Sequence, residues 1–232
     1  MKNTQLNSNN DFIAPPCSDE IEIIYQDQYL LVIDKPSGLL SLSGKNPLNK
    51  DSVHHRLVKI YPNPAMVHRL DFGTSGLMVI ALNKDVNAQI TKQFQLRLIS
   101  KTYEATLFGE LSSNEGDIRL PIARADFPYQ KVCSHKGKPA HSHFKVLDRF
   151  QDVVTGVKTT RVLFTPTTGR THQLRVHSQA IGHPILGCDL YSLSADGLNS
   201  KLLAPRLMLH ANTLSFEHPV TGKRIMNKSK AT

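Results

Sequence analysis

One carboxylate, Asp71, stands among residue types that favour a rigid reactive group. It belongs to the run His68-Arg69-Leu70-Asp71-Phe72-Gly73-Thr74-Ser75-Gly76-Leu77, and six apolar residues, 77–82, end the segment. Six apolar residues bounded by turn residues are typical of a buried strand. We therefore predict that Asp71 lies on a tight turn feeding a core strand, where a catalytic group finds rigid support. The alternative is an Asp that caps the turn by accepting backbone hydrogen bonds.

Several further stretches carry residue types suited to chemistry or to anion binding. They are Asp34-Lys35-Pro36-Ser37-Gly38-Leu39, Lys101-Thr102-Tyr103-Glu104-Ala105, Gly169-Arg170-Thr171-His172-Gln173-Leu174-Arg175-Val176-His177, His183-Pro184-Ile185-Leu186-Gly187 and Leu209-His210-Ala211. With the Asp71 run, their order and spacing resemble the RluA family of RNA pseudouridine synthases over roughly residues 30 to 220. The segment around Lys131-Val132-Cys133 and Gly137-Lys138-Pro139-Ala140, and the compact length, look most like the compact member after which that family is named.

This resemblance implies the family's fold and its chemistry. The expected fold is α+β, with a central mixed, largely antiparallel sheet flanked by helices and loops. The expected reaction breaks the N-glycosidic bond of a uridine, rotates the base and rejoins it through C5. No redox step and no activated donor are needed, so we expect no cofactor and no metal. The carboxylate of Asp71 would stabilise or trap the oxocarbenium charge, attack the pyrimidine ring, or take a sugar proton, and the sequence does not choose among these.

By the same resemblance, Arg175 pairs with Asp71, and Tyr103 stacks on the target base. An ionised carboxylate in a site that excludes water tends toward a raised pKa, and a guanidinium fork opposes that tendency. Tyr103 is also a candidate general acid or base, and Leu174 is the matching apolar wall. The alternatives are an Arg175 that contacts phosphate or solvent, and a Tyr103 that belongs to the core.

RNA binding has its own candidate residues. The target base must leave its stack, and Arg69 is well placed to fill the vacated space or to hold a phosphate, with a structural salt bridge as the alternative. His68 is interpreted as structural. The remaining candidates lie in basic stretches and are Lys131, Lys136, Lys138 and Arg170.

The charge of the chain favours a polyanionic partner. Lys and Arg number 28 against 19 Asp and Glu, a net charge of +9. Such an excess points chiefly to nucleic acid. Three stretches hold basic residues with no acid, namely 128–143, 169–177 and 218–232. Each alone is compatible with a solvated basic loop, but three beside the motifs favour an RNA-binding surface.

Periodicity predicts the elements that must position these residues. A hairpin is expected over 21–25 and 29–34, and further strands over 102–107, 144–147, 161–164 and 206–216, the last being the final strand. A helix capped by Asn83 has the apolar stripe Val86, Ile90, Phe94 and Leu98. A second helix has the spacing of Leu174, His177, Ser178 and Ile181, and closes at Gly182. Strands outnumber helices without regular alternation, which favours α+β.

The length and composition favour one domain. The chain has 232 residues, of which 40% are hydrophobic. We expect a disordered polar tail over 1–18, a catalytic domain over 19–228 and no RNA-binding domain of the S4 type. No apolar run approaches the ~18 residues of a membrane helix, and no secretory signal is visible. Cys17, Cys133 and Cys188 form no Cys-x-x-Cys pair and indicate free thiols. We expect a cytoplasmic monomer without membrane contact.

Two other classes of function stay open at this point. A non-catalytic RNA-binding protein on the same fold would not need Asp71, Tyr103 and Arg175 together. A nucleoside or glycoside hydrolase usually needs two carboxylates, and no second acid stands in a comparable motif. The C-terminal residues 226–230 are basic, whereas relatives often end in an acidic or aromatic segment, so the last strand and its contacts stay open.

Overall fold

The protein is a strand-rich chain, and the computed structural model describes residues 12–153, 156–195 and 198–230. The strands are β1 Glu22–Gln26, β2 Leu30–Lys35, β3 Ala65–Met66, β4 Ser75–Ala81, β5 Ser100–Phe108, β6 Glu115–Ile118, β7 Ile122–Arg124, β8 Gln130–Val132, β9 Ser142–Gln151, β10 Lys158–Pro166, β11 Ser194–Ala195, β12 Leu198–Asn199, β13 Leu209–Glu217 and β14 Arg224–Lys228. The helices are the 3-10 turn η1 Pro47–Asn49, α1 Val53–Leu57, α2 Lys84–Gln95 and α3 Gln173–Ala180. Within these described ranges, no helix has the length and apolar character needed to cross a membrane.

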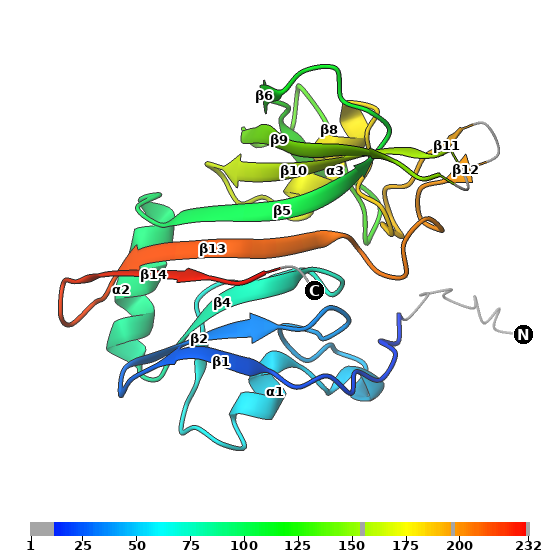
Figure 1. The fold of residues 1–232 in the computed structure, drawn as a ribbon. Helices are drawn as coiled ribbons and strands as arrows, with labels where there is room; N and C mark the ends of the chain where they lie inside the picture. Colours follow the sequence, from blue (N-terminus) through cyan, green and yellow to red (C-terminus); the bar gives the residue numbers. More distant parts are fainter. Residues whose placement is uncertain (1–11, 154–155, 196–197, 231–232) are drawn as a thin grey trace, which may run out of the picture.

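Ten strands form one twisted sheet (Figure 1). Their order is β1-β2-β4-β13-β5-β10-β9-β6, with β14 beside β13 and β3 beside β4. Among the described strands, β4 and β13 form the one parallel pair, and the other neighbours are antiparallel. The expected α+β class and the mixed, largely antiparallel sheet are confirmed.

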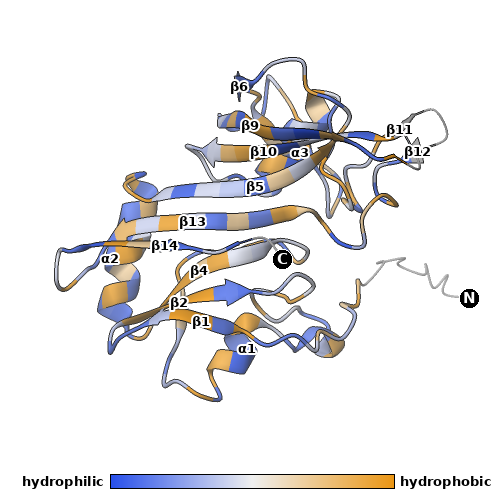
Figure 2. Ribbon diagram, in the orientation of Figure 1, coloured by the Kyte–Doolittle hydropathy of each residue, from blue (hydrophilic) through white to orange (hydrophobic). Residues whose placement is uncertain are grey.

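In the N-terminal half of the sheet, β2 and β4 are buried on both faces. Every residue of β4 is buried, and Figure 2 shows apolar residues concentrated in β2 and β4. On one face, Val86 and Ile90 of α2 pack against alternate residues of these strands. On the other face, Val53 and Leu57 of α1 pack against the intervening residues. Continuous apolar strands are therefore required here, as expected for a sheet covered on both sides.

The helix predicted after Asn83 is present, but its apolar stripe is shorter than expected. The Asn83 side chain accepts a hydrogen bond from the Val86 amide at 2.9 Å, which caps α2. Arg97 has a left-handed φ of 58° just beyond the helix end. Leu98 consequently leaves the helical path and is 54% exposed. The expected fourth member of the stripe is therefore wrong, because the chain turns away after Phe94.

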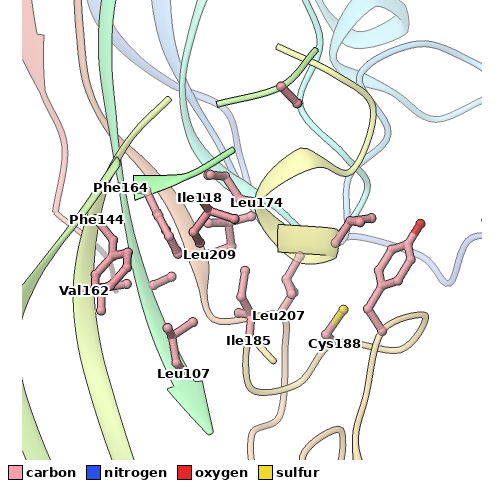
Figure 3. Close-up of a cluster of buried hydrophobic side chains, with 14 of the residues drawn as sticks. Leu107, Ile118, Phe144, Val162, Phe164, Leu174, Ile185, Cys188, Leu207 and Leu209 are labelled. Atoms are coloured by element: carbon pink, nitrogen blue, oxygen red, sulfur yellow. The ribbon is translucent and has the colours of Figure 1, made fainter. Parts of the chain in front are cut away.

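The C-terminal half of the sheet packs against α3. Leu107, Val162 and Phe164 from β5 and β10 meet Leu174 of α3 in one buried cluster (Figure 3). As predicted, the helix closes at Gly182, which has a left-handed φ of 81°. This cluster fixes α3 against the sheet.

The end of the chain differs from the prediction, because β13 is not the final strand. β14 pairs antiparallel with β13, and the following Ser229 is buried. Its amide donates to the Asn212 carbonyl at 2.9 Å. The segment does not show the period-two pattern of a strand, because Asn227 is polar on the inner face while the apolar Met226 is 72% exposed. The β7–β8 hairpin was also missed, because three-residue strands carry too little periodicity.

The chain before β1 lies against the folded body. Of the tail predicted over 1–18, residues 1–11 lie outside the described residues. The Ala14 amide donates to the Asn49 side chain at 2.7 Å, and Asn49 donates to the Phe12 carbonyl at 2.6 Å. The Arg56 guanidinium donates to the Cys17 carbonyl at 2.5 Å. The packed part of the chain therefore extends back at least to Phe12.

Candidate active site

Asp71 occupies a tight turn directly before β4, as predicted. The turn is closed by the Thr74 amide, which donates to the Asp71 carbonyl at 3.1 Å. The Asp71 side chain is 27% exposed, so its carboxylate is accessible from solvent while its backbone is held. Because β4 is buried along its whole length, the turn is anchored directly to the core.

A second loop holds the Asp71 turn in place. The Lys35 ammonium donates to the Phe72 carbonyl at 3.2 Å, and the Gly38 amide donates to the same oxygen at 3.0 Å. The Ser37 hydroxyl donates to the Gly73 carbonyl at 2.7 Å. Residues 35–38 belong to a motif to which the sequence assigned no role. In the structure they clamp the backbone beside Asp71. Only the tertiary contact between the two loops reveals this.

Lys35 places a buried amine beside the turn. The side chain is fully buried, and its nitrogen also donates to the carbonyls of Pro36 and Leu39, both at 2.8 Å. Burial lowers the pKa of Lys35 to about 7, and the Cys17 thiol and the carboxylates of Asp71 and Asp34 oppose that decrease. Three carbonyl acceptors match the three N–H bonds of an ammonium, whose charge then favours ionised carboxylates nearby.

Arg175 lies in the first turn of α3 and faces Asp71. Its guanidinium is 5% exposed, with Nη1 3.6 Å from Oδ2 of Asp71. Nη2 lies closer, at 2.6 Å, to Oδ1 of Asp189, and Nε donates to Sγ of Cys188 at 3.3 Å. The structure thus brings the predicted pair together. It adds Asp189 as a second carboxylate, which no sequence pattern had indicated.

His172 and Tyr191 complete the surroundings of the pair. Nε2 of His172 is 3.9 Å from Oδ1 of Asp71, and Nδ1 is 2.8 Å from the Tyr191 hydroxyl. The Arg175 guanidinium lies over the Tyr191 ring, 5.2 Å from its centroid. Burial lowers the pKa of His172, and the Asp71 carboxylate partly offsets this effect. His172 belongs to a recognised motif, whereas Tyr191 lies outside every motif and was missed.

Tyr103 sits in the middle of the sheet, opposite Ala211 of β13 and Phe164 of β10. It packs against the clusters of both halves of the sheet, so it marks the place where they meet. Burial, and then the Asp71 carboxylate, raise the pKa of its phenol strongly. The phenol therefore keeps its proton at neutral pH and is a weak acid, which favours stacking over a role as general acid or general base.

The predicted RNA-binding residues differ in how far they are exposed to solvent. Arg69 is exposed beside the Asp71 turn, and Lys131, Lys136 and Lys138 are exposed on and after the β7–β8 hairpin. Arg170 is half-buried, and its Nε donates to the Pro139 carbonyl at 3.1 Å. Leu174 is different, because it is 7% exposed within the cluster against which Tyr103 packs. Its side chain therefore offers little surface to a ligand.

Two histidines of the motifs serve the scaffold. Nε2 of His68 accepts a hydrogen bond from the Val79 amide of β4 at 3.1 Å, which agrees with the structural interpretation. Nδ1 of His210 bonds Ser75 and Nε2 bonds Ser229, both at 3.0 Å. The Ser229 hydroxyl in turn donates to Asp34. These bonds join β2, β4, β13 and the C-terminal segment beneath the Asp71 turn.

Comparison with known proteins points to one family. The family model described as RNA pseudouridylate synthase matches residues 29–180. The "Dual-specificity RNA pseudouridine synthase RluA" of Vibrio parahaemolyticus is 45% identical over 208 residues, which cover 88% of this chain and 81% of the relative. The protein of the same name from Escherichia coli K12 is 42% identical over 220 residues, which cover 94% and 96%. The resemblance inferred from the motifs, including that to RluA itself, is confirmed.

Solved structures agree with the sequence relatives. The structure of "Human RNA Pseudouridylate Synthase Domain Containing 1" superposes with a TM-score of 0.76 at 28% identity, covering 94% of this chain and 86% of that one. "Human RNA Pseudouridylate Synthase Domain Containing 4" gives a TM-score of 0.68 at 26% identity, covering 91% and 88%. The likeness extends over nearly the whole fold.

Proposed function

Because this chain belongs to the RNA pseudouridylate synthase family, and is therefore an isomerase, we propose that it converts uridines of RNA stem-loops to pseudouridine. The substrates proposed are a 23S rRNA hairpin, a tRNA anticodon stem-loop, or both. The names of the two bacterial relatives describe enzymes of dual specificity, which supports two RNAs rather than one. The observation that carries the proposal is the Asp71–Arg175 pair at 3.6 Å, beside Tyr103 at the junction of the two halves of the sheet.

In the proposed reaction Asp71, Tyr103 and Arg175 act on one nucleotide. The N1–C1′ bond of the uridine breaks and a C5–C1′ bond forms. The hydrogen of C5 leaves as a proton and N1 takes up a proton, so substrate and product are isomers. The ionised Asp71 supplies negative charge where the sugar becomes positive. Arg175 orients that carboxylate and holds it ionised. Tyr103 stacks on the detached base, so that it turns without leaving.

The RNA is proposed to lie across the exposed basic residues that surround this pair. Lys131, Lys136 and Lys138 hold backbone phosphates from the side of the β7–β8 hairpin, and Arg170 does so from the start of α3. Arg69 fills the space that the flipped uridine leaves, or holds its phosphate. The exposure of these lysines and the net charge of +9 support this arrangement, since phosphate contacts dominate the affinity of such complexes.

The proposal also concerns the state of the protein. We place one catalytic domain over residues 19–228 and expect it to act as a cytoplasmic monomer that does not bind membranes. Cys17, Cys133 and Cys188 are free thiols, which supports a reducing compartment. Size-exclusion chromatography with light scattering at micromolar concentration tests the monomer directly.

The experiment that tests the activity measures tritium release from RNA labelled at C5 of uridine. The wild-type protein should release tritium without releasing free uracil, and Asp71→Asn should release none. RNA affinity of the variant should stay within about 3-fold of wild type, because Asp71 is assigned to chemistry rather than binding. Residual turnover of Asp71→Asn at about a tenth of wild type would remove Asp71 from this role. Free uracil would instead identify a hydrolase.

The substrate proposal has a separate test. The enzyme should modify an isolated stem-loop nearly as fast as the intact RNA, because flipping is easiest where the uridine is poorly stacked in a loop. The comparison is kcat/KM on a minimal hairpin, on full-length RNA, and on the hairpin with its loop uridine paired. An inert minimal hairpin, with assembled ribosomal particles reacting, would show that recognition extends beyond one stem-loop.

A further inference from the structure

The tip of the β7–β8 hairpin displays an aromatic ring to solvent. The loop between the two strands is closed by the Ala125 amide, which donates to the Tyr129 carbonyl at 3.1 Å, and by the Tyr129 amide, which donates to the Asp126 carbonyl at 2.7 Å. Phe127 lies between these bonds and is 90% exposed. In the described part of the chain, no other aromatic side chain is as exposed. The ring therefore adds nothing to the core and is free to bind a partner.

The hairpin is tied directly to the candidate active site. The Gln130 amide donates to the Tyr191 hydroxyl at 2.8 Å, and the Tyr129 ring stands edge-on to Tyr191 with centroids 6.1 Å apart. Tyr191 is the ring over which Arg175 lies. The loop end of the hairpin is thus fixed relative to the Asp71–Arg175 pair, and Phe127 is carried at a set place beside the site.

The charge around Phe127 identifies the partner. Against the single acid Asp126, the chain from 119 to 138 carries Arg119, Arg124, Lys131, Lys136 and Lys138. A second copy of this chain, with a net charge of +9, would meet like charge there. An exposed ring between cations is the arrangement with which proteins bind single-stranded nucleic acid, because cations follow the phosphates and rings stack on bases.

We propose that Phe127 stacks on an unpaired base in the loop that contains the target uridine. This inference rests on the proposed function and names a contact that anchors its substrate. Flipping the uridine unstacks its neighbours, and an exposed ring beside the site offers one of them a new stacking surface. Phe127 contributes to binding and not to the bond-breaking step, so its removal raises KM and leaves kcat unchanged.

Kinetics on a stem-loop test this contact. Phe127→Ala and Phe127→Leu should raise KM between about 5-fold and about 100-fold, the range that stacking on one base provides. Phe127→Tyr and Phe127→Trp should keep KM within about 2-fold of wild type, and kcat should be unchanged throughout. Phe127 is exposed, so the folding midpoints should not differ. An unchanged KM for Phe127→Ala, or full activity of Phe127→Leu, overturns the proposal.

Fluorescence reports the same contact without turnover. The chain contains no tryptophan, so Phe127→Trp in an Asp71→Asn background introduces one fluorophore at the hairpin tip. Adding the stem-loop should quench its emission saturably. The matched control is Phe150→Trp in the same background, because Phe150 is also an exposed aromatic residue, at 47%. It lies near the C-terminal end of β9, roughly 27 Å along the strand from Ser142 at its start. Equal quenching of both variants would contradict the proposal.

Abasic RNA identifies the base. One abasic substitution in the loop should abolish the quenching, and with that RNA Phe127→Ala should cost no further affinity, since the two changes remove the same contact. Additive losses at every loop position overturn the stacking.

Binding of wild type without isomerisation would reject the proposed function alone, whereas wild-type activity with an unaffected Phe127→Ala would reject this inference alone. A change of oligomeric state in Phe127→Ala would identify a second copy as the partner and would also overturn it.

Discussion

Arg175 shares one positive charge between two carboxylates. Its guanidinium approaches Asp189 to 2.6 Å but Asp71 only to 3.6 Å, and it lies over the Tyr191 ring, 5.2 Å from the centroid. A planar fork satisfies these partners at once, whereas a lysine provides a point charge on a flexible stem. The geometry of the Asp71 carboxylate therefore depends on the shape of Arg175 as well as on its charge.

Arg175→Lys should lower kcat/KM by roughly 10-fold to 100-fold. The lysine loses the charged hydrogen bond to Asp189 that holds the guanidinium beside Asp71, and such a bond contributes about 1.5–3 kcal/mol. Tritium release under single-turnover conditions measures this loss. The matched control is Arg161→Lys, whose guanidinium also lies 3.6 Å from a carboxylate, that of Glu104, but is 45% exposed. The control should stay within about 2-fold of wild type, since exposed pairs contribute little. Equal effects in both variants would mean that the Asp71 pairing has no special role.

At the scale of elements, the Asp71 turn depends on how closely β4 and β13 approach. Gly76 follows Ser75, the first residue of β4, and has a φ of +111°. It faces Ala211 of β13 in the parallel pairing. A Cβ built on Gly76 would lie 2.5 Å from the Ala211 backbone nitrogen and oxygen. The glycine is therefore required so that the strand after the Asp71 turn can pair with β13.

Gly76→Ala should destabilise the fold by at least about 3 kcal/mol, because backbone strain adds to a clash with another strand's backbone. Urea unfolding followed by circular dichroism measures the change. Gly222→Ala is the control, since Gly222 also has a positive φ, 67°, but a Cβ there would meet nothing within 4 Å. Gly222→Ala should lower the free energy of unfolding by only about 1–2 kcal/mol, the cost of placing an L-residue in the left-handed conformation. Similar costs for the two variants would refute the close approach.

At the scale of the whole molecule, the excess of positive charge should govern affinity for RNA. If four to six phosphates are contacted, log K against log salt should fall with a slope of roughly −3 to −5. Filter binding of a stem-loop at salt concentrations from about 50 to about 200 mM measures this slope. Replacing Lys131, Lys136 and Lys138 together by Gln should flatten the slope. A slope near zero would show that the net charge of +9 serves another purpose.

The buried histidines should make the fold sensitive to mild acid. Burial lowers the pKa values of His172, His177 and His210, and lowers that of His68 to about 3. Between the folded value and the ordinary one near 6.5, the unfolded chain binds more protons than the folded chain. Stability must therefore fall as the pH drops through this window.

Lowering the pH from about 6.5 to about 5.5 should reduce the free energy of unfolding by about 1 kcal/mol through His68 alone. Urea midpoints at the two pH values measure the loss. His68→Gln should reduce it by that amount, while the exposed His135→Gln should leave it unchanged. An undiminished loss in His68→Gln would show that His68 does not titrate as its burial implies.

The sequence by itself determined much of the chemistry and the local structure. The family resemblance of its ordered motifs proposed Asp71, Tyr103 and Arg175 as site residues, and periodicity predicted β4 and the Asn83-capped α2. Such features depend on neighbours within a few residues, because turns, caps and apolar alternation are local properties of the chain. Local pattern did not predict the exposure of Leu98, strand β14 or the β7–β8 hairpin, because the pattern there is short or partly polar.

Only the tertiary structure decided which distant residues meet. Asp189 and Tyr191 reach Arg175 because packing of α3 against the sheet brings the chain after Gly187 beside it. Lys35 reaches the Asp71 turn because β2 pairs with β4. The exposed Phe127 lies beside the site because the hairpin that bears it is bonded to Tyr191. These contacts join residues far apart in sequence, so they follow from packing and strand pairing, which no local pattern contains.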